Sequence, residues 1–68
     1  MTPLTATEVV FTIRYEPAGV EIAARPRRSA LADRAGVYRC AAGQSPYSPQ
    51  ARAAALADLN RKLMEAIL

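Results

Sequence analysis

Apolar side chains recur at every second position along residues 8–16, and the positions between them are polar except for Val10. A period of two places successive side chains on opposite faces of a β-strand. The pattern therefore predicts a strand whose core face carries Val9, Phe11, Ile13 and Tyr15. The β-branched run that starts at Val9 disfavours a helix, so we reject the capping-box spacing of Thr5 and Glu8. Residues 1–6 are then expected to be a loose lead-in.

A turn signal and a second alternating segment follow this strand. The sequence Glu16-Pro17-Ala18-Gly19 has proline at its second position and glycine at its fourth, as a type I turn prefers. Residues 20–25 alternate again, with Val20, Ile22 and Ala24 on one face. The two segments predict a β-hairpin, and Pro26 is expected to end its second strand.

Residues 26–36 are expected to form a basic connecting loop. Within it, residues 29–35 could form one helical turn with Gly36 beyond its end, or they could continue the loop. The short apolar segment from Val37 to Ala41 predicts a third strand, with Tyr38 and Cys40 facing the core.

An amphipathic helix is predicted for residues 48–68. Ser48 suits the N-cap position, and Pro49 suits the first helical position. Leucines and isoleucine then recur at spacings of three and four, which predicts one apolar stripe facing the core. The stripe is formed by Leu56, Leu59, Leu63 and Ile67, extended by Ala53, Met64 and Leu68. The polar face includes Asp58 and Lys62, an i,i+4 ion pair in the favourable order.

The predicted fold class is α+β, with one small domain over residues 1–68. A three-stranded antiparallel sheet precedes a single C-terminal helix that packs on one of its faces, giving the order β-β-β-α. Because the other face meets water, each strand should alternate rather than be apolar throughout. A core of this size is often helped by association, so a homodimer is part of the expectation.

The positive charge is concentrated in one segment. Residues 25–39 hold five arginines against one aspartate, or +4, and the remaining residues hold four basic against five acidic side chains, or −1. These arginines are the candidate partner-binding residues: Arg25, Arg27, Arg28, Arg34 and Arg39. A basic segment of this kind binds nucleic acid or an acidic protein surface, or it simply keeps a small protein soluble.

The composition disfavours an enzyme or a metal protein. The chain has no histidine, and Cys40 is its single cysteine, so neither a zinc site nor a histidine-based catalytic triad can be assembled. Glu16 and Glu21 flank the hairpin turn, where a chain this small offers no cleft to perturb paired carboxylates. We predict no catalytic, metal or cofactor-binding residue.

The order strand, turn, strand, strand, helix resembles the partner-binding domain of HicB-type antitoxins. The matching residues are Gly19, Gly43, Ser48 before Pro49-Gln50-Ala51, and Asn60 in the helix. The basic segment is longer than in that family, and its DNA-binding extension is missing here, so autoregulation is not carried over. The last strand and the alanine-rich helix also resemble the end of a double-stranded-RNA-binding domain, but Pro49-Gln50 stands where that family has a lysine pair.

The antitoxin resemblance implies sequestration of a protein partner through the sheet and its edges. We therefore expect a non-catalytic regulator or inhibitor of bacterial or phage origin that acts by protein–protein contact. No apolar run approaches the length needed to span a bilayer, and the N-terminal residues lack a signal-peptide pattern, so a cytoplasmic location is expected.

The alternative is a nucleic-acid-binding protein that uses the Arg25–Arg39 segment. In that case affinity for a DNA or RNA duplex should fall steeply with added salt, because phosphate contacts release counterions. Replacing Arg27 and Arg28 with alanine should weaken binding to all sequences alike, as measured by fluorescence anisotropy at two salt concentrations. Unchanged affinity in that double variant would dispose of the idea.

Overall fold

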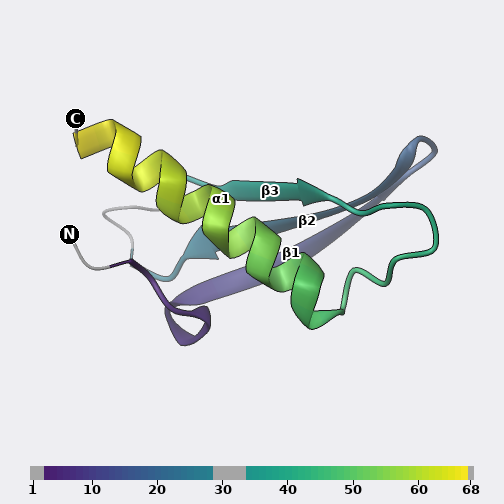
Figure 1. The fold of residues 1–68 in the computed structure, drawn as a ribbon, viewed down its shortest axis with the longest axis horizontal. Coiled ribbons are helices and arrows are strands. Elements are labelled where there is room, and N and C mark those ends of the chain that lie inside the picture. Colours follow the sequence, from purple (N-terminus) through teal and green to yellow (C-terminus); the bar gives the residue numbers. More distant parts are fainter. Residues whose placement is uncertain (1–2, 29–33, 68) are drawn as a thin grey trace.

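The fold is a three-stranded antiparallel sheet followed by one long helix (Figure 1). The structure is a computed structural model, which describes residues 3–28 and 34–67. A 3-10 helix, η1 (Ala6–Glu8), leads into the sheet. The sheet has the order β1-β2-β3, and its strands are β1 (Val9–Glu16), β2 (Gly19–Pro26) and β3 (Gly36–Arg39). The helix that follows is α1 (Pro49–Ile67). The predicted α+β class and element order are confirmed.

The hairpin forms where its turn signal lies. Glu16 pairs with Gly19 across a two-residue turn, and the register continues to the pairing of Val9 with Pro26. Gly19 has a φ of 151°, a conformation that side chains rarely adopt, which explains why glycine suits this position. β3 begins one residue earlier than predicted and ends at Arg39 rather than Ala41.

The hydrogen-bond ladder fixes which backbone groups face outward. The amide N–H of Arg27 donates to the carbonyl oxygen of Glu8, and that of Cys40 donates to the carbonyl oxygen of Val20. Hydrogen-bonded pairs alternate along an antiparallel ladder. The even-numbered residues of β1 therefore bond to β2, and its odd-numbered residues direct their N–H and C=O groups to the outer edge. Pro26, which has no N–H, lies opposite Val9 in a pair that is not hydrogen-bonded, so the ladder between β1 and β2 loses no bond there.

The core lies between α1 and the β2–β3 half of the sheet. The helix α1 packs mainly against β3 and β2. The buried side chains come from α1, from β2 and from the first residue of β1: Val9, Ile22, Ala24, Ala51, Ala55, Leu59 and Leu63. Tyr38 and Cys40 pack against this cluster, so their predicted inward direction is confirmed.

The buried stripe of α1 is rotated from the predicted one. Ala51 and Ala55 are fully buried, and Leu56 is only half-buried. Ala53 and Met64, which we assigned to the core face, are exposed. The small alanines lie innermost because the helix backbone approaches β3 closely, and a leucine at either position would hold it away. The side chains of Ile67 and Leu68 lie outside the described residues.

Gly36 is the residue that permits this close approach. A Cβ atom built on it would lie 2.2 Å from the carbonyl oxygen of Ala55 and 2.3 Å from the amide nitrogen of Leu59. Gly36 itself opens β3 and is not among the glycines with positive φ, so it does not take the left-handed conformation of a helix C-cap. The proposed turn itself, over residues 29–35, lies largely outside the described residues.

The N-terminal segment is held more firmly than a loose lead-in. The side-chain amide of Asn60 accepts a hydrogen bond from the Leu4 N–H at 2.8 Å and donates one to the Leu4 carbonyl oxygen at 3.0 Å. Our rejection of the capping box is also wrong, because the Thr5 N–H donates to the Glu8 carboxylate at 3.0 Å. The box closes the single turn of η1, and the β-branched run begins only after that turn.

Candidate functional site: the two edges of the sheet

The outer edge of β3 is closed by the helix. The Val37 N–H, which points away from β2, donates to a carboxylate oxygen of Asp58 at 2.8 Å. Lys62 and Arg61 approach the same carboxylate at 2.9 Å and 2.7 Å, so the predicted Asp58–Lys62 pair is present. Lys62 also donates to the Ala35 carbonyl oxygen at 3.0 Å. The edge of β3 is therefore already bonded to α1 and is a poor template for another strand.

Asp58 is held in its charged form by these partners. Desolvation favours the neutral acid, but the hydrogen bonds from the Val37 backbone, from Lys62 and from Arg61 outweigh it. The pKa of Asp58 is consequently held well below its ordinary value. Its side chain is 21% exposed, so the carboxylate is partly shielded from water. The sequence pattern places Asp58 on the polar face of the helix. It does not indicate the bond by which Asp58 links the helix to the sheet.

The outer edge of β1 is open along the described part of the chain. Phe11, Ile13 and Tyr15 direct their backbone groups outward, and within residues 3–28 and 34–67 no hydrogen bond to these groups is found. Figure 1 shows β1 at the border of the sheet opposite β3, with no further strand beside it in the described chain. An edge of this kind is a ready template for an added strand.

An apolar groove lies beside that edge on the helix side. It has a volume of about 320 Å³ and lies between η1, β1 and the N-terminal half of α1. Its lining is mostly apolar, with one charged group: Ala6, Phe11, Pro49, Arg52, Ala53 and Leu56. The groove exists because α1 lies over β2 and β3, which leaves the helix-side face of β1 only partly covered.

Two exposed tyrosines lie at the hairpin end of the same face. Tyr15 is 66% exposed and Tyr47 is 68% exposed. The prediction that Tyr15 belongs to the core is wrong, because α1 begins too far from this end of β1 to cover it. The neighbouring Tyr47 side chain raises the pKa of Tyr15 above its ordinary value. Exposed tyrosines are enriched where proteins bind one another.

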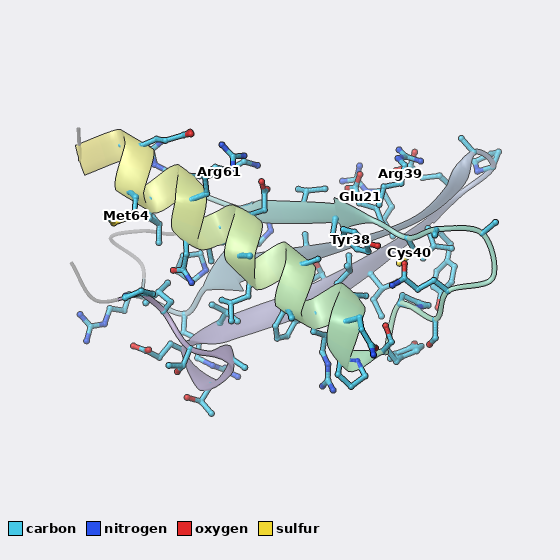
Figure 2. The ribbon with its side chains drawn as sticks, viewed as in Figure 1. Glu21, Tyr38, Arg39, Cys40, Arg61 and Met64 are labelled. Atoms are coloured by element: carbon cyan, nitrogen blue, oxygen red, sulfur yellow. The ribbon has the colours of Figure 1, made fainter. Side chains whose placement is uncertain are left out.

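The five candidate arginines do not form one patch. Arg25, Arg27 and Arg28 lie at the end of β2, and Arg34 lies just before β3, which puts these four at the same end of the sheet. Arg39 lies at the opposite end of β3, where it forms an ion pair with Glu21 at 3.9 Å (Figure 2). All five are exposed. Arg27 is also engaged, since its Nε donates to the Thr7 carbonyl oxygen.

The solvent-facing side of the sheet carries mixed charge. Arg14 lies opposite Glu21, and Glu21 lies opposite Arg39, so one acidic residue stands between two basic ones across the three strands. Arg14 additionally approaches Glu16 at 3.7 Å. A face of alternating sign offers no continuous track for a phosphate backbone. Among the sheet's arginines, only the four at the β2 end remain candidates for such a track.

The described residues show no gathering of chemically reactive groups. Over residues 3–28 and 34–67, no three acidic, cysteine or histidine side chains lie together as metal ligands would. Glu16 approaches Arg14 at 3.7 Å, and Glu21 approaches Arg39 at 3.9 Å. Cys40 is half-buried against the core. In the same part of the chain, no helix has the length and apolar character to cross a bilayer.

The loop between β3 and α1 is organised by Gln44. Its side-chain oxygen accepts hydrogen bonds from the Tyr38 hydroxyl and from the Ala41 N–H, both at 2.9 Å. Gly43 turns the chain with a φ of 81°. Ser48 then caps α1 as predicted, because its hydroxyl oxygen accepts the Ala51 N–H at 3.1 Å. The loop thereby holds Tyr47 at the hairpin end and directs α1 back along the sheet.

Comparison with known proteins found no matching family model, no matching curated protein and no matching solved structure.

Proposed function

We propose that this chain is a non-catalytic protein-binding regulator or inhibitor that captures a partner segment as an added strand along the outer edge of β1. The observation that carries the proposal is the contrast between the two edges. The β3 edge is bonded to α1 through Asp58 and Lys62, whereas the outward groups of the β1 edge have no partner within residues 3–28 and 34–67 and lie beside an apolar groove. Added strands gain affinity from main-chain hydrogen bonds and specificity from side-chain pockets.

The resemblance to HicB-type antitoxins supports the same mode of action, since it implies sequestration of a protein through a sheet and its edges. We accordingly place the protein in a bacterial or phage-infected cytoplasm, where a toxin or a host factor would be its target. The spread of the arginines gives less support to nucleic-acid binding, because Arg39 is paired and lies away from the other four candidates.

Chemical synthesis of the 68-residue chain allows a test with a single methyl group. Methylating the amide nitrogen of Ile13 removes one outward N–H and blocks the edge, but it leaves the bonds between β1 and β2 intact. We expect the unmodified chain to retain a specific protein from a lysate of its source cells. The methylated chain should retain at least about tenfold less, because added strands depend on main-chain hydrogen bonds.

The matched control is methylation of the Arg14 amide, which points toward β2. That change should lower the unfolding midpoint in urea, whereas the Ile13 methyl should leave it nearly unchanged. Equal retention of the partner by the unmodified and Ile13-methylated chains would contradict strand addition at β1.

A further inference from the structure

We infer that the segment captured at β1 is extended and acidic, with alternating apolar side chains on its groove side and a carboxylate directed at Arg52. This inference rests on the proposed function and specifies the chemistry of the partner. It follows from three features of the open edge: the side chains that line the groove, the charges beside it and the direction of the outward backbone groups.

The groove side of the added strand must be apolar. A strand paired with β1 places every second side chain on the helix side, next to Phe11 and under Ala53 and Leu56. These three side chains present only carbon to the groove. A buried polar group there would lose its bonds to water without gaining a partner, so valine, isoleucine or leucine fits best.

The charges along the edge favour an acidic segment. Arg52 is the one charged residue lining the groove, and within residues 3–28 and 34–67 it takes part in no ion pair. Arg14, on the other face of β1, is 70% exposed, but it approaches Glu16 at 3.7 Å and lies opposite Glu21, so the groove side carries the clearer demand for negative charge. The chain as a whole carries +3. A carboxylate on the groove side of the added strand would therefore meet complementary charge at Arg52.

A second copy of this chain fits the site less well. The groove-side residues of β1 are Val9, Phe11, Ile13 and Tyr15, which include no carboxylate to meet Arg52. Pairing two copies would also bring together two chains that each carry +3. The apolar part of the groove would be filled, but its one cation would stay without a partner.

The test uses a fluorescein-labelled synthetic peptide of nine residues. Its odd positions are valine or leucine with one glutamate, and its even positions alternate threonine and glutamate. The first control peptide has lysine in place of every glutamate, and the second has the same composition with the alternation scrambled. Fluorescence anisotropy gives the affinity of each peptide, and amide chemical shifts of the labelled protein locate the site. We expect the acidic peptide to bind best and to shift the amides of Phe11, Ile13 and Tyr15.

Charge reversal makes the test specific. Arg52→Glu should weaken the acidic peptide by about tenfold and strengthen the lysine peptide by a similar factor, as paired charges across an interface do. Arg34→Glu changes the net charge equally but lies by the C-terminal half of α1, next to Lys62 and Glu65, so it should alter neither affinity more than about twofold.

Three results would overturn the inference. The first is binding of the acidic peptide that does not respond to Arg52→Glu, and the second is no binding of that peptide at all. The third is a dimer in light scattering that the Ile13 methyl dissociates, which would assign the edge to a second copy. The proposed function fails separately, when a natural partner still binds the Ile13-methylated chain.

Discussion

Replacing Gly36 with alanine should unfold the domain or leave it barely stable. The added methyl would overlap the carbonyl oxygen of Ala55 and the amide nitrogen of Leu59, which are backbone atoms and cannot turn aside as a side chain can. Overpacking costs about 1–3 kcal/mol when side chains can adjust, and we expect more than about 3 kcal/mol here. A domain of this size has only roughly 3–10 kcal/mol of stability in total.

Urea denaturation followed by circular dichroism measures this effect. Gly43→Ala is the matched control, because Gly43 has nothing within 4 Å of its added methyl and only its φ of 81° opposes the change. That variant should lose about 1 kcal/mol, the cost of the left-handed conformation for a residue with a side chain. If Gly36→Ala is no less stable than Gly43→Ala, then α1 does not approach β3 as closely as described.

Replacing Asp58 with asparagine should lower the free energy of unfolding by about 2 kcal/mol at pH 7, because hydrogen bonds to a charged group contribute about 1.5–3 kcal/mol. Asparagine keeps the size of the side chain but removes the charge that Lys62 and Arg61 face. The Val37 N–H then donates to a neutral amide oxygen in place of a carboxylate oxygen, or it faces the amide NH₂ group and loses its acceptor. Guanidinium denaturation of both proteins at the same pH measures the difference.

The effect of Asp58 should depend on pH in a defined direction. Its folded-state pKa is depressed, because the bonds from Val37, Lys62 and Arg61 outweigh the desolvation that opposes them. A depressed pKa stabilises the fold above the unfolded value of about 3.9 and loses that contribution as the pH falls toward the folded value. The advantage over Asp58→Asn should therefore shrink by up to about 1.4 kcal/mol per pH unit below about pH 4. A difference that stays constant down to pH 3 would contradict the link.

The fold could be predicted because its signals are local. The alternation along β1, the proline and glycine at the hairpin turn, and Ser48-Pro49 at the start of α1 each depend on neighbouring residues only. Each of them appears in the structure at or within a residue of its expected place. The sequence also supplied the Asp58–Lys62 pair, since an i,i+4 spacing on a helix is again a local relation.

The buried face of α1 and the groove could not be predicted, because both depend on where α1 lies across the sheet. Spacing alone favoured the leucines as the inner stripe, and Leu59 and Leu63 are buried as expected. Ala51 and Ala55 are buried beside them, because Gly36 lets the helix backbone approach β3 closely. Because α1 lies over β2 and β3, the helix-side face of β1 is only partly covered, which opens the groove at Phe11. Tyr15 is exposed because α1 begins too far from the hairpin end to cover it. The available signals were Gly36 at the start of a strand and Ala51 and Ala55 at i and i+4 on the helix. They indicate a close contact between strand and helix only when they are considered together.

The candidate site could not be predicted from the sequence for a related reason. The sequence drew attention to arginines because charge is visible without a structure, whereas an open strand edge is a property of sheet order. Asp58 reads as a surface carboxylate until the Val37 N–H is placed against it. Asn60, noted only for the antitoxin resemblance, proves to hold the Leu4 backbone.

The central claim is that β1 has a free outer edge while the β3 edge is bonded to the helix. Amide hydrogen exchange of the isolated chain, followed by NMR at single residues, tests it most directly. We expect the outward amides of Phe11, Ile13 and Tyr15 to exchange much faster than those of Val10, Thr12 and Arg14, and the Val37 amide to be protected by Asp58. Equal protection of odd and even residues along β1, or fast exchange at Val37, would contradict the account.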